Sequence, residues 1–407
     1  MKLIAIALLV AYLYTLAFGV FMTGFFRIPA PFVFCFPLLV FFKERINTEF
    51  IYWNTLLFLT TAGFLYSVVG MSVDAGFAAN IISITICAFF FNHYVGSSVE
   101  RLHFVIFVFF ALLGVSVIVL MLDHFFINMS SLRSTLLGEP IVQSPSGIAV
   151  YQFNFGYQVA ALAPFAFIYT CVFQKPLLIR GIVLAVCIGF LFLGMQRSAF
   201  VAFVICIILF MFFYYKGKAI LSVALVGLVC AGLYFLVLKD NLDNIENIVT
   251  KNEHNDAAYN RSGLLEENLK IYLDYPYGLI FYGKSWNDVI YRNYVFSSGI
   301  TSHNAYMMFL TYLGPFLGLG FLLAIYYRVC AICVYVIKYI RAKENALLVC
   351  LCFSFVGVSI NALSHNPWLI GADGPTIFLY FGVLHLYWQT KNKNIIPETV
   401  VHNIKHA

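Results

Sequence analysis

Charged side chains are scarce in this sequence. Of its 407 residues only 10% are charged and 62% are hydrophobic, whereas about a quarter of the residues in an ordinary soluble domain are charged. The mean hydropathy over the whole chain is +0.90. This shortage of charge excludes a soluble globular protein, a disordered chain, a coiled coil and a nucleic-acid-binding protein. It predicts one integral membrane domain.

The sequence also lacks the short motifs that hold nucleotides and metal ions. It contains no Asp-x-Asp, His-Glu-x-x-His, P-loop, Gly-x-Ser-x-Gly or dinucleotide-binding fingerprint. The histidine pair His402 and His406 lies at the extreme C-terminus, where a frayed tail is the simpler interpretation. Chemistry on a nucleotide sugar or ATP is therefore disfavoured, and we expect an activity that needs no metal and no cofactor.

None of the ten cysteines is placed to form a disulfide in an outer loop, because each falls inside an apolar run. Cys330 and Cys333 have the spacing of a redox motif, but no polar helix start precedes them. We interpret them as packing residues, which is the usual role of a small, polarisable side chain.

The apolar runs predict an all-α fold, a polytopic helical bundle of the inner membrane. A spanning helix needs about 20 mostly apolar residues, which gives about twelve transmembrane helices here. The first run continues unbroken to Phe26, so we interpret it as a membrane helix and not as a cleaved signal peptide. The predicted spans are 3–26, 28–42, 50–71, 76–92, 102–122, 148–173, 180–196, 198–215, 219–238, 303–328, 345–363 and 375–390. The chain thus divides into helices 1–9 at 1–238, a large loop at 239–302, and helices 10–12 with a tail at 303–407.

The positions of Lys and Arg predict the orientation. With the N-terminus in the cytoplasm, fifteen of the 24 basic residues fall on the cytoplasmic side, Arg328 among them, and three fall in short outer segments. The other six lie in 239–302, and long loops are translocated largely regardless of charge. We therefore predict that both termini are cytoplasmic and that 239–302 is a periplasmic loop.

The large loop has a helical pattern in its second half. Leu264, Leu265, Leu269 and Tyr272 recur at helical spacing and predict an amphipathic helix at 262–273. A Pro-Tyr-Gly run follows at 276–278 and is expected to end it. The loop is therefore expected to be partly helical.

Three residues on the predicted outer side are candidates for chemistry. Arg197 interrupts two apolar runs, and a guanidinium at the headgroup level can bind two phosphate oxygens at once, although a turn residue that anchors a hairpin is the alternative. Arg261 opens the amphipathic helix, where the helix dipole disfavours a cation, so either it has another role or it is solvated. His303 begins a long apolar run, and its ordinary pKa near 6.5 suits a general base, although a structural histidine is the alternative. The pair His365 and Asn366 is interpreted as part of the aromatic interface.

At these residues the sequence resembles the O-antigen polymerase and O-antigen ligase superfamily of bacterial envelope glycosyltransferases. The resemblance is carried, over about 190–320, by GMQRS at 194–198, RSGLLEENLKIYLDYPYG at 261–278, and His303-Asn304 at the next span. The turn reads Gln-Arg-Ser where many relatives have Ser-Arg-Gly.

The resemblance implies roles for these residues. Members transfer or polymerise glycans delivered on undecaprenyl pyrophosphate at the periplasmic face, without nucleotide sugar or metal. Arg197 and Arg261 would hold the donor pyrophosphate, and His303 would orient or deprotonate the acceptor hydroxyl. Asn304 would be a further substrate contact, and Tyr272 and Tyr277 would stack on sugars.

The favoured function is polymerisation of lipid-linked repeat units into O-antigen or a related surface polysaccharide. Strong Phe and Tyr enrichment and patchy motif agreement are typical of enzymes that each fit a different sugar repeat. The alternatives are a ligase that transfers glycan to lipid A core, and a flippase or other transporter. A transporter should carry charges in mid-span and internal repeats, and the sequence shows neither. The expected partners are an undecaprenyl-pyrophosphate-linked oligosaccharide, the lipid bilayer and a chain-length regulator protein, and no nucleic acid.

Overall fold

The computed structural model describes residues 2–23, 26–42, 49–71, 75–218, 227–228, 232, 261–296, 299–366, 369–371 and 374–393. Almost all of the predicted span 219–238, the first part of the large loop and the pair His402 and His406 lie outside the described residues. The predictions made for them stay predictions.

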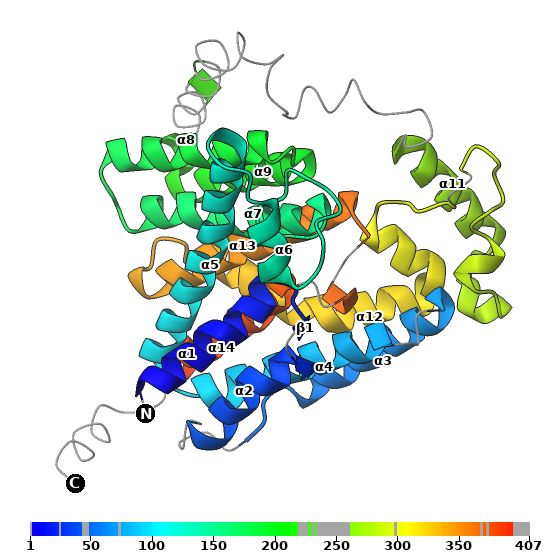
Figure 1. Cartoon of the computed structure of the whole chain (residues 1–407), viewed down its shortest axis with the longest axis horizontal. Helices are drawn as coiled ribbons and strands as arrows, with labels where there is room; N and C mark the ends of the chain where they lie inside the picture. The colour runs from blue at the N-terminus through cyan, green and yellow to red at the C-terminus, as the bar shows by residue number, and fades with distance from the viewer. Residues whose placement is uncertain are drawn as a thin grey trace.

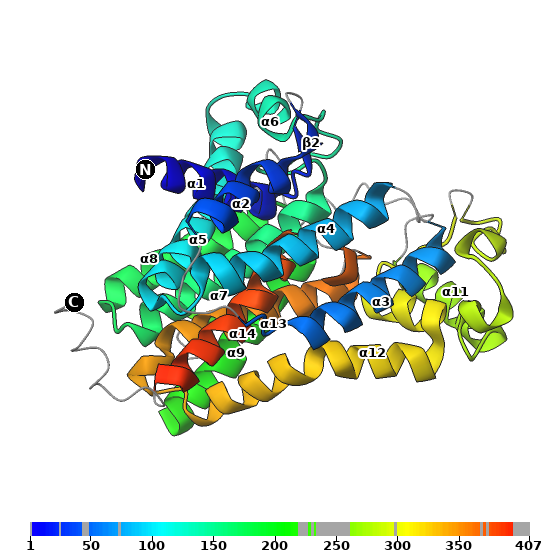
Figure 2. The same ribbon diagram turned by 90° about the horizontal axis from the view of Figure 1, so that it is seen from below.

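The described chain is built almost entirely of helices (Figures 1 and 2). The α-helices are α1 (Lys2–Phe18), α2 (Ala30–Phe41), α3 (Trp53–Gly70), α4 (Ala75–Phe89), α5 (Val99–Phe125), α6 (Ser130–Leu137), α7 (Gln152–Val172), α8 (Leu177–Leu193), α9 (Arg197–Tyr215), α11 (Arg261–Asp274), α12 (Ala305–Lys338), α13 (Ala346–Asn361) and α14 (Gly374–Lys393). A π-helical segment, η1 (Phe90–Val95), continues α4, and short 3₁₀ turns lie at η2 (Lys216–Lys218), η7 (Leu279–Tyr282), η8 (Trp286–Asp288), η9 (Lys343–Asn345), η10 (Ala362–Ser364) and η11 (Leu369–Gly371). Strands β1 (Met22–Thr23) and β2 (Phe26–Pro29) form one antiparallel pair.

Among the described residues, seven helices are long and apolar enough to cross a membrane by length and composition. They are α3, α5, α7, α9 and α12, the helix Gly76–Val95 made of α4 and η1, and the helix Lys343–Ser364 made of η9, α13 and η10. Helices α1, α2 and α8 are shorter apolar helices. The helical class is thus confirmed over the described residues apart from the β1–β2 pair. The count of about twelve spans and the periplasmic position of the loop stay predictions.

Helices α7 and α13 form the centre of the bundle. Both are largely buried, and α13 packs against α7, α9 and α14. They approach closely because a Cβ on Gly357 would lie only 2.5 Å from the carbonyl oxygen of Ala160, and the Ser354 hydroxyl donates to the carbonyl of Ala161 at 2.9 Å. Small residues at a helix contact are the usual means of close packing in membranes. These contacts fix α13 against α7.

Two predicted boundaries are wrong. Helix α1 ends at Phe18, where Gly19 takes a positive φ of 67°, and the chain then enters the β1–β2 pair although the sequence stays apolar. The span predicted to end at 328 continues as α12 to Lys338. Arg328 therefore lies inside a helix and not in the loop that follows it.

Helix α12 is broken near its start. Gly314 has φ 73° and ψ −179°, a conformation open essentially only to glycine. The next residue, Pro315, has no N–H to donate to the preceding turn. A Cβ on Gly314 would lie 1.8 Å from the carbonyl oxygen of Tyr277, so the segment after α11 packs directly into the break. Figure 1 shows α11 and its neighbouring turns gathered at this end of α12.

Candidate functional site

The turn between α8 and α9 places Arg197 at the first position of α9. Gln196 holds the turn by donating its side-chain amide to the carbonyl of Gly194 at 2.8 Å. The ring of Phe155 in α7 covers Gly194 so closely that a Cβ there would lie 2.6 Å from a ring carbon. The break in hydropathy that the sequence shows at 194–198 is therefore a tight turn fixed against the central helix.

Arg197 has free hydrogen-bond donors in a buried position. Its Nε and Nη2 atoms are buried, and neither has a hydrogen-bond partner among the residues that the structure describes. Leaving a buried donor unpaired costs about 1–3 kcal/mol, so such groups in a native protein need an explanation. Nε and Nη2 form one edge of the guanidinium, which is the edge that binds two oxygens of a phosphate or carboxylate. This edge of Arg197 is chemically able to bind an anion.

The residue after Arg197 joins α9 to the end of α13. The hydroxyl of Ser198 lies 2.7 Å from Oδ1 of Asn361 and 2.9 Å from Nε2 of His365. An amide oxygen can only accept, so the single hydroxyl proton is donated to Asn361, and the hydroxyl accepts from Nε2–H of His365. His365 is 8% exposed, and the rings of Phe153 and Tyr157 lie beside it with centroids 6.4 and 6.2 Å away. Its imidazole is therefore held in one position.

The start of α12 lies against the same end of α13. The hydroxyl of Tyr306 donates to the carbonyl of Ser359 at 3.1 Å. Two further buried oxygens here, Oγ of Ser359 and Oδ1 of Asn366, have no partner in the described part of the chain, nor has Nδ2 of Asn361. We use the name polar cluster for Arg197, Ser198, Ser359, Asn361, His365 and Asn366. These residues come from two segments, 197–198 and 359–366, which are remote from each other in sequence and meet at one end of the bundle.

His303 and Asn304 precede α12 at this contact. His303 has a positive φ of 46°, which is uncommon for a residue with a side chain and costs on the order of 1–3 kcal/mol. Asn304 caps α12, since its side-chain oxygen accepts from the backbone N–H of Met307 at 3.0 Å. The structure uses the side-chain oxygen of Asn304 for the helix cap, and the assignment of Asn304 to substrate binding stays a prediction.

The remaining predicted site residues lie on α11 and just after it. The amphipathic helix predicted at 262–273 is present as Arg261–Asp274, and Arg261 begins it, but the side chain of Arg261 lies outside the described part of the structure. Tyr272 is half-buried. Tyr277 is exposed, and its ring stacks at 6.3 Å on that of Phe316. The contact between Tyr277 and Phe316 joins the chain after α11 to the broken part of α12.

Helix α11 is fixed to α12 by a buried hydrogen bond. Asn268 has no exposed surface, and its side-chain oxygen accepts from the hydroxyl of Thr311 at 2.8 Å. Trp286, in the turn that follows, packs its ring at 5.5 Å from that of Tyr312. The second half of the large loop is therefore a structured cover over the first part of α12, the part that begins next to His303.

Within the described residues, no group of three or more His, Cys, Asp or Glu side chains is arranged to hold a metal ion. The nine described cysteines are free thiols, and most are buried. The guanidinium of Arg197 and the neutral polar side chains of the polar cluster are groups that this end of the bundle offers to a substrate.

The comparison with protein families finds a match for the middle of the chain. Residues 182–327 match the model of the O-antigen ligase family. This segment belongs to that family. It contains all six residues that the sequence singled out, from Arg197 to Asn304, and it confirms the resemblance predicted for about 190–320. No curated protein matches the chain.

The family match over 182–327 and the apolar helices together indicate a membrane protein with an activity of the O-antigen ligase and polymerase type. The O-antigen ligase segment supplies Arg197 and Ser198, but Asn361 and His365 come from α13 and the chain after it, beyond the matched residues. The polar cluster is thus completed by a part of the chain that the family match does not reach.

Proposed function

We propose that the protein joins glycans carried on undecaprenyl pyrophosphate, and that it polymerises repeat units of O-antigen or a related surface polysaccharide at the periplasmic face of the inner membrane. The observation that carries this proposal is the pair of buried donors on Arg197, which have no partner in the described parts of the chain and lie within the O-antigen ligase family segment. A diphosphate has the oxygens that this edge of the guanidinium can bind.

In the proposed reaction the acceptor hydroxyl attacks the anomeric carbon of the donor sugar. The new C–O bond forms as the bond to the pyrophosphate oxygen breaks, and one in-line displacement inverts the anomeric centre. Negative charge grows on the departing pyrophosphate, and fixed cations stabilise it without a general acid. Arg197 provides one such cation, and we assign Arg261 as the second.

The acceptor proton must pass to a base as the new bond forms, and we assign this role to His303. His303 lies just before α12 and has a strained backbone. Such strain persists only where the surrounding structure holds a residue in place, and this fixed position supports the assignment. His365 has a different position, with one ring nitrogen engaged by Ser198. We propose that His365 and Ser198 position the start of α9, and with it Arg197.

Ligation of a lipid-linked glycan to lipid A core is the second candidate, because the matched family is described as O-antigen ligase. The two activities share the donor and the leaving group, so the same residues would serve either one. They differ only in the acceptor, which is a second lipid-linked repeat in one case and lipid A core in the other.

Reconstitution distinguishes the candidates. The purified protein is placed in vesicles with undecaprenyl-pyrophosphate-linked repeat units, and the products are separated on a gel. A ladder formed from these units alone supports the polymerase, whereas transfer only when lipid A core is added supports the ligase. Movement of the labelled lipid across the vesicle membrane without any new glycosidic bond would indicate a flippase. Adding a chain-length regulator protein should change the ladder's length distribution if that partner is correct.

A further inference from the structure

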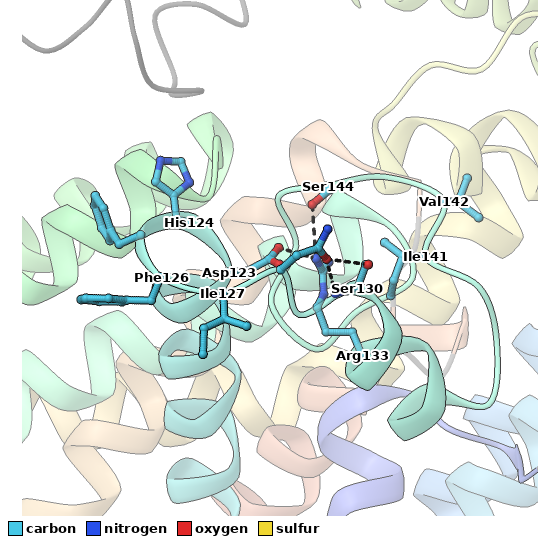
Figure 3. A pocket seen from close by; sticks show the side chains of 11 residues that line it. Asp123, His124, Phe126, Ile127, Ser130, Arg133, Ile141, Val142 and Ser144 are labelled. Atoms are coloured by element: carbon cyan, nitrogen blue, oxygen red, sulfur yellow. Dashed lines mark hydrogen bonds and ion pairs between the residues drawn. The ribbon is translucent and has the colours of Figure 1, made fainter.

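A cavity of about 660 Å³ lies where α5 ends and α6 begins. Its lining combines polar and apolar side chains, which are Asp123, His124, Phe125, Phe126, Ile127, Asn128, Ser130, Arg133, Ile141, Val142 and Ser144. Figure 3 shows Asp123, Ser130, Arg133 and Ser144 grouped in the middle, with His124 and Phe126 to one side and Ile141 and Val142 to the other. The proposed reaction uses none of these residues.

The base of the cavity is built around Arg133, which is only 1% exposed. Its guanidinium donates to Oδ2 of Asp123 at 2.8 Å, to the hydroxyl of Ser144 at 3.2 Å and to the hydroxyl of Ser146. Burial lowers the pKa of Arg133, and the carboxylate of Asp123 opposes that shift. The other oxygen of Asp123 accepts from the backbone N–H of Met129 at 2.6 Å. The cavity is thus held by a network that ties α5, α6 and the chain at 144–146 together.

This network decides what kind of ligand fits. The single Arg and the single Asp of the lining neutralise each other, so the cavity has no surplus cation for a pyrophosphate. Around them lie neutral hydrogen-bonding groups on Asn128 and Ser130 and exposed apolar surface, with Phe126 77% exposed. A sugar carries hydroxyls at its edges, which need both donors and acceptors, and C–H groups on its faces, which pack on apolar side chains. A neutral polar cavity with an aromatic side suits a sugar.

The cavity adjoins the turn that carries Arg197. The buried ring of Phe155 lies between two glycines, because a Cβ on Gly147 and a Cβ on Gly194 would each come within 2.6 Å of it. Gln152 makes a second connection, since its amide donates to the carbonyl of Ser144 at 2.8 Å and lies 3.7 Å from Sδ of Met195. Ser144 in the wall of the cavity and Met195 in the Arg197 turn are therefore joined through Gln152. We infer that one extended glycan substrate reaches both.

We propose that this cavity is a saccharide subsite, which holds a sugar of the glycan substrate while the pyrophosphate end of a donor lies at Arg197. The inference rests on the proposed function for the identity of the substrate. It adds a recognition site outside the O-antigen ligase family segment. Substitutions at this site would change which sugar repeat binds without altering the polar cluster.

Direct binding of a free oligosaccharide tests the subsite without requiring catalysis. The probe is the repeat unit released by mild acid from the lipid-linked intermediate that accumulates when the gene is deleted. Its affinity for the purified protein in nanodiscs is measured by calorimetry. Asn128→Ala and Phe126→Ala alter exposed side chains, so the fold should persist, and each should weaken binding about tenfold, the effect of losing about 1.4 kcal/mol. Phe173→Ala, which truncates another exposed phenylalanine far from the cavity, is the matched control and should bind normally.

The outcomes for the subsite and for the proposed function can be told apart. Arg197→Ala should abolish glycan transfer and leave the affinity for the free oligosaccharide unchanged. Equal affinity in the wild type, Asn128→Ala and Phe126→Ala would overturn the subsite, as would a wild-type protein that binds no oligosaccharide. Binding that depends on Asn128 and Phe126 in a protein that transfers no glycan would keep the subsite and refute the polymerase.

Discussion

Replacing Arg197 with lysine separates the two possible roles of this residue. Lysine keeps the positive charge but loses the planar edge formed by Nε and Nη2. If Arg197 only anchored a turn, these atoms would be bonded to the protein, yet both are buried without a partner among the described residues. Arg197→Lys should therefore impair the reaction and leave the fold intact.

The size of the effect follows from the bonds that are lost. A hydrogen bond to a charged group contributes about 1.5–3 kcal/mol. Each 1.4 kcal/mol of lost binding free energy weakens binding about tenfold. Losing one of two bonds to the pyrophosphate should lower kcat/KM by about 10- to 150-fold. Stability should not fall, because Nε and Nη2 make no bond within the described protein that the substitution could break.

The assay is polymer formation by the purified protein from lipid-linked repeat units, with thermal unfolding in detergent measured in parallel. Arg341→Lys is the matched control, since Arg341 donates through Nε and Nη2 to the carbonyl of Tyr214 at 2.8 and 2.6 Å. That variant should show a small loss of stability and normal kcat/KM. Near-normal kcat/KM in Arg197→Lys, or a lowered melting temperature with proportionate loss of activity, would refute the assignment of Arg197 to the phosphate.

Three further predictions concern the fold, the base and the orientation. Gly314→Ala should lower the melting temperature in detergent, with a loss of at least about 2 kcal/mol, because alanine is strained at this positive φ and meets a neighbouring carbonyl; unchanged melting would contradict the close packing at the break. His303→Gln should cut kcat about 10²–10⁴-fold while lipid-linked donor still binds, whereas His365→Gln should retain most activity because glutamine can still bond to the serine hydroxyl; the reverse order would exchange their roles. A reporter fused after Lys251 should be periplasmic and one fused after Lys343 cytoplasmic, and a cytoplasmic signal at 251 would place the loop on the wrong side.

Elements set by local patterns could be predicted closely. The helix predicted at 262–273 is present at Arg261–Asp274, because its apolar spacing and the Pro276 and Gly278 that follow act within a few residues. The apolar runs likewise mark where most of the described helices lie. The end of α1 could not be predicted, since Val20 and Phe21 beyond it are as apolar as the helix itself, and only the backbone at Gly19 distinguishes them.

The position of Arg328 led to a wrong prediction of where α12 ends. The rule that charged residues end a span placed the boundary at Arg328, but the helix continues for ten further residues to Lys338. A long basic side chain can extend along a helix toward the membrane surface, so an arginine does not have to end the helix that carries it.

The candidate site was predicted only in part. Arg197 could be found because it interrupts the hydropathy, and hydropathy is a local property. Its neighbours in space could not, because Ser198 meets Asn361 across 163 residues and His365 across 167. The pair His365 and Asn366 carried a signal as polar residues between apolar segments, but a single sequence does not show which helix ends meet.

Binding of undecaprenyl pyrophosphate, the carrier released in the proposed reaction, tests the central claim most directly. The affinity of the purified protein in nanodiscs is measured by titration for the wild type and for Arg197→Met, which keeps an unbranched side chain and removes the charge and the donors. We predict that the variant unfolds at the wild-type temperature or above and binds the carrier at least about tenfold more weakly, the loss of about 1.4 kcal/mol or more. Equal affinity in the two proteins would contradict the account, because the donor pyrophosphate would then be held somewhere other than Arg197.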